Sequence, residues 1–242
     1  MTFARRRPGR FLLATFVLTW AFYGALIWSG HSPYEMPWML LLIAGGMAPS
    51  LVGVVLILLG DRADRRDFWR RAIGLRSISA GWWAFIASIF PLIYVAAVAL
   101  DLALGGAKPG LDQGRALMTT PALLPLVAFI SFLSGPWSEE FGWRGYLLDP
   151  LLARFGERRG SILLGLIWGF WHLPLYAMPA TWHGQMGFRL EGFWAFMLLN
   201  VGLSLLMTRV HRATAGSLPA ALFIHFAANF TSQLLAPVSD RV

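Results

Sequence analysis

The sequence PWMLLLIAGGMAPSLVGVVLILLG, residues 37–60, contains no charged side chain. An α-helix rises about 1.5 Å per residue, so about 20 apolar residues cross the hydrocarbon core of a bilayer. The apolar run is also continuous, whereas a membrane β-strand alternates between apolar and polar side chains. This stretch therefore predicts a transmembrane helix, and it decides the class of fold.

Six other segments of the chain share this length and this near absence of charge. They comprise residues 11–28, 82–100, 116–138, 161–178, 192–208 and 213–239. We therefore expect an all-α, polytopic membrane helix bundle of about seven transmembrane helices, with six to eight as the range. The fourth segment contains Pro121, Pro125 and Gly135-Pro136, so we expect it to be long and tilted, kinked at Gly135, or partly re-entrant.

The composition agrees with a membrane protein. Hydrophobic residues make up 57% of the 242 positions and charged residues 13%, and the mean hydropathy is +0.60. About 25% of residues are charged in a typical soluble domain, so a water-soluble enzyme, a coiled coil and a disordered chain are disfavoured as classes. The chain has no cysteine, which excludes disulfides, thiolate metal sites and cysteine nucleophiles.

The basic residues predict the orientation of the bundle. With a cytoplasmic N-terminus and seven crossings, only Lys108, Arg115, Arg189 and Arg241 of the 20 Lys and Arg residues lie outside. Cytoplasmic segments carry such an excess, and the Arg-rich usage indicates a bacterial inner membrane. The bias accounts for the net charge of +8 without a nucleic-acid partner. Residues 61–76, the longest polar stretch, are expected to form a cytoplasmic loop with a short surface helix near anionic lipid.

Ionisable side chains inside the apolar segments are few. They are Glu139, Glu140, Arg144, His172 and His225, accompanied by the amide of Asn229. A charge at the bilayer centre costs about 2.5–3.5 kcal/mol on insertion scales, so such residues face the bundle interior and have partners. Glu140 and Arg144 are four residues apart, lie on one helical face and can form an ion pair. Glu139 points about 100° away and is left without that partner, which suits a general base.

Two histidines in other segments are expected at a depth similar to that of Glu139. His172 shares a helical face with Trp168, and His225 shares one with Asn229. Both histidines lie about 18 Å, and Glu139 about 22 Å, from the cytoplasmic ends of their segments. A single buried histidine is more often structural than catalytic, but the joint occurrence of these groups at one level favours a functional site.

Other polar and small residues are given structural roles. His31 and His183 are expected in external loops and His211 in a cytoplasmic turn. Gly165 and Gly169 form a small-x-x-x-small pattern, which is typical of helix packing in membranes.

Three motifs in this order resemble those of the CPBP family of intramembrane proteases. That family includes type II CAAX prenyl endopeptidases and bacterial Abi-type bacteriocin-processing and immunity proteins, and its motifs are Glu-Glu-x-x-x-Arg, Phe-x-x-x-His and His-x-x-x-Asn. The corresponding residues here are Glu139-Glu140 with Arg144, Trp168 with His172, and His225 with Asn229. The resemblance covers roughly residues 121–235. Trp168 departs from the family pattern, because it stands where that pattern has Phe.

The resemblance implies an endopeptidase whose site lies in the membrane and opens to the cytosol. It gives roles to six side chains: water activation by Glu139 and His172, oxyanion stabilisation by His225 and Asn229, and positioning or tuning by Glu140 and Arg144. The substrate would be a peptide or a membrane protein, with a lipidated substrate as one option. Residues 116–242 would form the catalytic bundle, and residues 1–115 the N-terminal spans and basic loop, of one integral membrane unit.

Metal dependence stays open at this point. Glu139, His172 and His225 could provide a His₂Glu zinc site with water as the fourth ligand. A metal-free mechanism with Glu139 as base is the alternative that we favour, because the chain lacks the His-Glu-x-x-His spacing in which two zinc ligands and a base share one helix. The sequence therefore requires no cofactor, and zinc is the one cofactor that it allows.

Two functions other than proteolysis are also compatible with the pattern. A non-catalytic Abi-type immunity or scaffold protein would share the fold, although the intact motif residues argue against it. A proton or metal transporter would also use buried polar groups. It should, however, show inverted repeats with paired broken helices, and only one Pro-broken segment is found.

Overall fold

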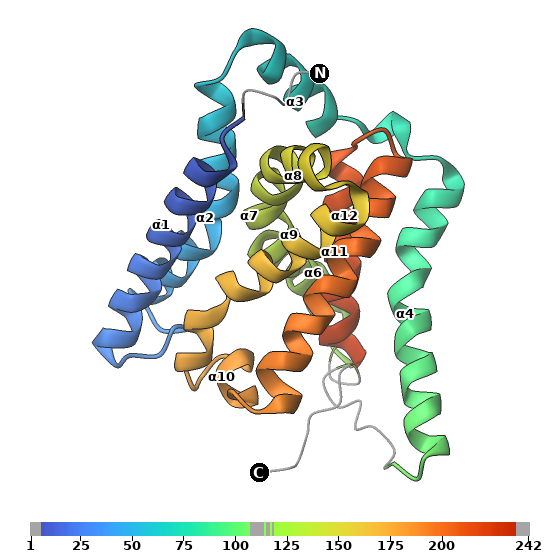
Figure 1. Cartoon of the computed structure of the whole chain (residues 1–242). Coiled ribbons are helices and arrows are strands. Elements are labelled where there is room, and N and C mark those ends of the chain that lie inside the picture. The colour runs from blue at the N-terminus through green and yellow to red at the C-terminus, as the bar shows by residue number, and fades with distance from the viewer. Residues whose placement is uncertain (1–5, 107–113, 115–116, 118, 236–242) are drawn as a thin grey trace.

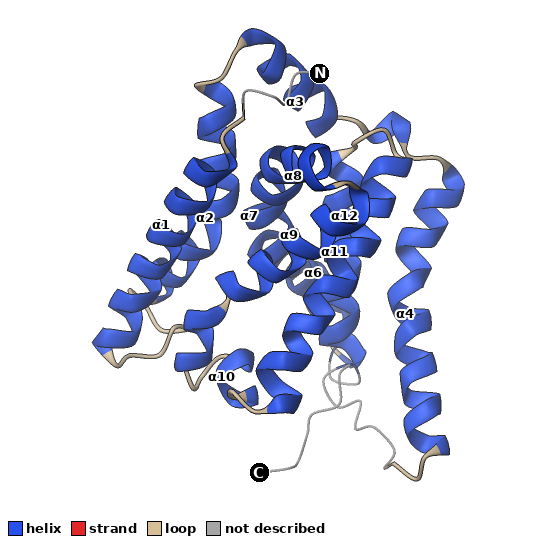
Figure 2. Ribbon diagram, in the orientation of Figure 1, coloured by secondary structure: helices blue, strands red, loops and turns tan. Residues whose placement is uncertain are grey.

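The structure is a computed structural model that describes residues 6–106, 114, 117 and 119–235. Within those residues it contains helices and no strand, and seven helical segments are long and apolar enough to cross a membrane. Figure 1 shows a bundle with α1 and α2 along one edge and α4 along the opposite edge. Figure 2 shows that the elements of the bundle are helices joined by loops. The expected all-α membrane fold is therefore confirmed.

The membrane-capable segments are as follows in chain order. They are α1 (Pro8–Ser29), α2 (Met39–Leu58), α4 (Ala80–Ala103), Pro121–Phe155, Glu157–Ala177, Glu191–Ala213 and α12 (Leu218–Leu235). The three compound segments contain α6 (Leu124–Phe132), α7 (Ser138–Gly142), α8 (Leu148–Phe155), α9 (Glu157–Trp171) and α11 (Ala195–Ala213). Two short helices lie between spans, α3 (Arg62–Ala72) and α10 (Trp182–Met186).

The fourth segment is one long, distorted helix. Two π-helical turns, η4 (Leu133–Trp137) and η5 (Trp143–Leu147), lie on either side of α7. Pro136 lies inside η4, and because proline lacks an N–H and clashes with the preceding turn, it accounts for the first distortion. The irregularity expected at Gly135-Pro136 is therefore present as a π-helical turn. The predicted end at residue 138 is wrong, because the helical segment extends to Phe155 and includes charged residues after position 138.

The seventh segment begins later than predicted. Its helix starts at Leu218, after a turn in which Ala215 and Gly216 have φ angles of 54° and 77°. Left-handed residues end helices, and Gly216 adopts this conformation without steric cost. The predicted start at residue 213 is therefore wrong. His225 lies about two turns, or about 10 Å, into its helix rather than about 18 Å.

The two ends of the bundle carry different elements. Figure 1 places α3 and α8 at one end and α10 at the other. Several residues on which the sequence predictions drew lie outside the described part of the chain: Arg5, Lys108, Arg115, residue 116, residues 236–239 and Arg241.

Glycines bring the helices of the site into close contact. A Cβ at Gly53 of α2 would lie 2.7 Å from the Cα of Gly142 in α7, so the two backbones touch there. A Cβ at Gly165 of α9 would lie 2.6 Å from the Cα of Val201 in α11, and Gly169 also faces α11. The packing role predicted for Gly165 and Gly169 is therefore confirmed.

Helix α3 is the short helix that was predicted in residues 61–76. Asp61 caps it, because the Asp64 backbone N–H donates to Asp61 Oδ1 at 2.8 Å. Its inward face was not predicted: Asp64, Phe68 and Arg71 are buried against the bundle. The helix is therefore part of the core at this end of the molecule as well as part of its surface.

Candidate active site

Helix α7 carries two adjacent glutamates inside the bundle. Glu139 and Glu140 are 4% and 0% exposed, and Arg144, one turn later in η5, is 0% exposed. Arg144 Nη1 donates to Glu140 Oε1 at 2.9 Å, so the expected ion pair is confirmed. A buried charge requires a buried partner, and Glu140 provides one for Arg144.

Glu140 has a second partner on another helix. His225 Nδ1 lies 2.8 Å from Glu140 Oε1, the oxygen that also accepts from Arg144. An ionised carboxylate only accepts hydrogen bonds, so the Nδ1 atom of His225 carries the hydrogen. The sequence did not predict this contact, because 85 positions separate the two residues and no helical period relates them.

Glu139 is bonded differently from its neighbour. Its Oε2 atom accepts a hydrogen bond from the indole Nε1 of Trp168 at 2.5 Å. Within the described residues no ion pair within salt-bridge distance reaches Glu139, as expected from its place outside the Glu140–Arg144 pair. The negative charge of Glu140 is thus compensated by the Arg144 cation, whereas the Glu139 carboxylate is held by the neutral indole N–H of Trp168.

His172 follows the last residue of α9 and is oriented by the backbone. Its Nδ1 atom lies 2.8 Å from the carbonyl oxygen of Trp168, one turn earlier. Because a carbonyl oxygen only accepts, Nδ1 carries the hydrogen and Nε2 has a lone pair. This tautomer leaves an acceptor nitrogen on His172.

His225 and Asn229 converge on Gly135. A Cβ at Gly135 would lie 2.5 Å from Asn229 Nδ2 and 3.3 Å from His225 Nε2. The two nitrogens therefore face one small space that a glycine in η4 leaves open, and the predicted common face of α12 is confirmed. The Asn229 amide N–H, together with the Nε2–H that His225 has when its ring is an imidazolium, can stabilise a negative oxygen that develops at this point.

His183, which the sequence analysis expected in an external loop, is a neighbour of the site. His183 lies on α10, and its ring stacks on that of His172, with centroids 5.3 Å apart and 24° between the planes. Thr181 caps this helix, because its Oγ1 accepts from the Gly184 backbone N–H at 3.0 Å. Burial lowers the pKa of His183 to about 4, so the ring is neutral at pH 7. No sequence pattern signalled the contact, because it depends on how the chain folds back after α9.

The residues considered as zinc ligands do not form a ligand set. Within the described residues, no three His, Cys, Asp or Glu side chains are placed to hold a metal ion. Glu139, His172 and His225 are therefore not arranged as a His₂Glu site requires, and no step of the mechanism is routed through a metal.

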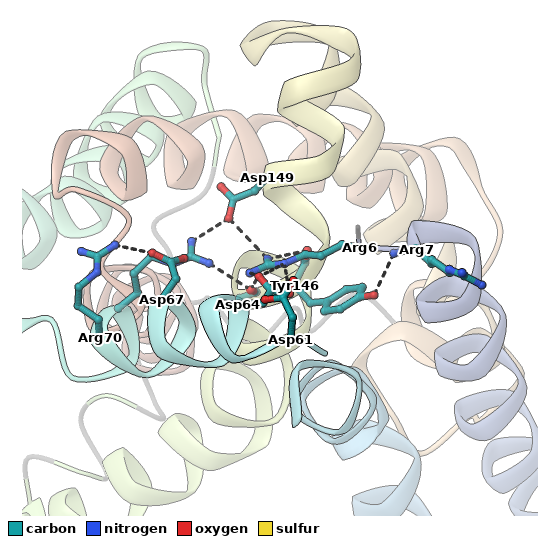
Figure 3. A network of polar contacts seen from close by, with 10 residues as sticks. Arg6, Arg7, Asp61, Asp64, Asp67, Arg70, Tyr146 and Asp149 are labelled. Carbon is teal, nitrogen blue, oxygen red and sulfur yellow. Dashed lines mark hydrogen bonds and ion pairs between the residues drawn. The ribbon is translucent and has the colours of Figure 1, made fainter. Parts of the chain in front are cut away.

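A buried ionic cluster fixes the helix that follows the glutamates (Figure 3). Arg6 Nη2 lies 2.8 Å from Asp64 Oδ1, and Arg6 Nη1 donates to the carbonyl oxygen of Gly145 in η5 at 2.9 Å. Arg71 Nη1 donates to Asp149 Oδ2 in α8 at 2.8 Å. The cluster of Arg6, Asp64, Arg71 and Asp149, here named the Arg6 cluster, therefore joins the N-terminal segment and α3 to η5 and α8.

Comparisons with known proteins identify the same region of the chain. Residues 121–231 match the family model described as type II CAAX prenyl endopeptidase Rce1-like. The chain is also similar to CAAX prenyl protease 2 of Methanococcus maripaludis, with 28% identity over 239 residues that cover 96% of this chain and 86% of the relative. All six side chains predicted for the site lie within the matched residues.

Proposed function

Because this chain belongs to the CPBP family of membrane-embedded peptidases, we propose that it hydrolyses peptide bonds with Glu139 and His172 as the pair that activates water. The difference between the two adjacent glutamates carries this proposal. Glu140 is bonded to Arg144 and to His225, whereas the described partner of Glu139 is a neutral indole. A carboxylate that no cation compensates is the better proton acceptor, so Glu139 is the base.

In the proposed reaction Glu139 removes one proton from a water molecule while the water oxygen attacks the peptide carbonyl carbon. The lone pair of His172 Nε2 accepts a hydrogen bond from the other water hydrogen and orients the attack. The new C–O bond forms as the carbonyl π electrons move onto oxygen and produce an oxyanion. When the oxyanion collapses, the C–N bond breaks and Glu139 returns its proton to the leaving nitrogen.

His225 and Asn229 are assigned to the oxyanion because their nitrogens converge beside Gly135. Asn229 Nδ2 always carries hydrogens. His225 donates from Nε2 when its ring is an imidazolium, which presents one N–H to Glu140 and the other to the oxyanion. Losing one donor of this kind lowers kcat by about 10²–10³-fold in hydrolases.

The substrate class and the orientation are further parts of the proposal. The similar protein is named a CAAX prenyl protease, so peptides with a prenylated CAAX C-terminus are the first class proposed for this chain. Unmodified leader-type peptides are the second. The basic residues of α3 support a cytoplasmic N-terminus, with the site open to the cytosol of a bacterial cell.

Cleavage by the purified protein in nanodiscs tests the proposed function. We would compare the wild type with Glu139→Gln on a farnesylated CAAX peptide and on a leader-peptide library, with and without a chelator. Glu157→Gln is the matched control, because Glu157 is 45% exposed and pairs with Arg212 at the surface. We expect the Glu139 variant to be inactive, and the wild type and control to be active in chelator. Undiminished cleavage by Glu139→Gln would show that the assignment of the base is wrong.

A further inference from the structure

The indole of Trp168 lies at the centre of the proposed site and is 2% exposed. Its Nε1 atom donates to Glu139 Oε2 at 2.5 Å. The guanidinium carbon of Arg144 lies 4.6 Å from the ring centroid, in a cation–π contact. The ring of His225 meets the indole edge-on, with centroids 5.2 Å apart and 80° between the planes. One aromatic ring therefore contacts both the Glu139 side and the Glu140 side of the site.

We propose that the indole N–H of Trp168 positions Glu139 for water activation, a role that rests on the function proposed above. The family motif has Phe at this position, and a phenyl ring has no hydrogen-bond donor. Within the described residues, Trp168 supplies the hydrogen bond found on the Glu139 carboxylate. The substitution in this chain is thus a gain of a directed donor, in addition to an exchange of one aromatic ring for another.

The bond has a specific mechanical effect on the carboxylate. The terminal torsion of a glutamate side chain is broad and roughly two-fold, so an unbonded carboxylate exchanges its two oxygens freely. The N–H of Trp168 fixes Oε2 and leaves Oε1 as the oxygen for the reacting water. A neutral donor achieves this without compensating the negative charge, in contrast to the cation that holds Glu140.

Trp168 also sets the distance between the two members of the water-activating pair. Its side chain holds Glu139, and its backbone carbonyl oxygen lies 2.8 Å from His172 Nδ1. Glu139 and His172 belong to different helices, so their spacing depends on how α7 packs on α9. A residue that contacts both makes this spacing less sensitive to small movements of either helix.

Replacement of the N–H alone tests this positioning role. Site-specific incorporation of 3-benzothienylalanine at position 168 exchanges the N–H for sulfur and keeps the bicyclic ring. Trp168→Phe is the simpler companion variant. A hydrogen bond to a charged group contributes enough that we expect kcat to fall about 10- to 100-fold, with KM and the thermal unfolding midpoint unchanged in the benzothienyl protein.

The matched control is the same replacement at Trp143. That indole is buried, and its N–H has no hydrogen-bond partner in the described structure, so its removal should leave kcat unchanged. Wild-type kcat in the benzothienyl-168 protein, or an equal loss in the control, would overturn the positioning role.

Glu139→Gln separates this inference from the proposed function. An inactive Glu139→Gln protein together with a fully active benzothienyl-168 protein would refute the role of Trp168 alone. An active Glu139→Gln protein would refute the role of Glu139 as base, on which this inference rests. If Trp168 acts through Glu139, adding Trp168→Phe to Glu139→Gln should cause no further loss of the residual rate.

Discussion

His225 and Glu140 are 85 positions apart in the chain, yet His225 Nδ1 lies 2.8 Å from Glu140 Oε1. The same oxygen accepts a hydrogen bond from Arg144 at 2.9 Å. The other oxygen, Oε2, has no hydrogen-bond partner in the part of the chain that the structure describes. One buried oxygen atom therefore joins the turn after α7 to α12. Glu140 is for this reason better suited to hold the site together than to accept a proton during the reaction.

Glu140→Gln and Glu139→Gln should differ in stability as well as in activity. Removing the Glu140 charge leaves Arg144 buried at 0% exposure without its counter-charge, and breaking a buried ion pair costs about 3–5 kcal/mol. Glu139 has no cationic partner among the described residues, so its replacement should leave the free energy of unfolding close to that of the wild type. Thermal unfolding of both variants in the same detergent measures the difference. Equal midpoints would contradict the structural role of Glu140.

Gly135→Ala should impair catalysis without removing a functional group. The new methyl group would lie 2.5 Å from Asn229 Nδ2 and 3.3 Å from His225 Nε2, so both nitrogens must move. We expect kcat to fall about 10²-fold, as for the loss of one oxyanion donor. Gly202→Ala is the matched control, because a Cβ there meets nothing within 4 Å and a helical glycine gains stability on replacement by alanine. Steady-state kinetics on both variants decides the matter, and normal turnover by Gly135→Ala would argue against a converging donor pair.

Arg6→Ala should destabilise the protein although Arg6 lies far from α7 in sequence. The substitution leaves Asp64 buried beside the vacated position and removes the hydrogen bond to the Gly145 carbonyl oxygen, so we expect a loss of about 3–5 kcal/mol. Arg6→Lys should recover part of the loss, because an ammonium group cannot match the planar fork of a guanidinium. Arg10, which is exposed on α1, provides the control: Arg10→Ala should unfold at the wild-type temperature. A wild-type midpoint for Arg6→Ala would show that the Arg6 cluster contributes little.

Acid should destabilise the wild-type protein more than a His183→Phe variant. Burial lowers the pKa of His183 from 6.5 to about 4, so the unfolded chain takes up the proton first as the pH falls. The resulting stability is fully present above pH 6.5 and is lost progressively as the pH falls towards 4. The effect is at most about 3 kcal/mol. Unfolding midpoints of both proteins across this range provide the measurement, and parallel curves would contradict the burial of His183 over His172.

The sequence predicts most of the helices because lipid leaves few alternatives. An uncharged run of about 20 residues in a bilayer must satisfy its backbone within one helix, so composition alone locates the spans. Their ends are less predictable. No charge marks the turn before Leu218, and its left-handed residues Ala215 and Gly216 stop one helix and start the next.

The contacts of the site could be predicted only within one helix. Glu140 and Arg144 lie one turn apart, so spacing was sufficient to pair them. The contact of Glu140 with His225, and the bond from Trp168 to Glu139, depend on how three helices pack, and periodicity contains no such information. The role of the Trp168 N–H could not be predicted from the sequence, because the carboxylate that accepts its hydrogen bond lies on another helix.

The two π-helical turns beside α7 amount to extra residues held within a continuous helix. A π-turn closes its hydrogen bond over five residues instead of four, so it rotates everything after it about the helix axis with little gain in length. The direction of Glu139 and Glu140 is therefore set independently of the helices before and after them. It follows that deleting a single residue from η4 or η5 would turn both carboxylates away from their partners while α6 and α8 kept their own packing. A change in chain length of this kind would abolish the proposed activity without substituting any side chain of the site.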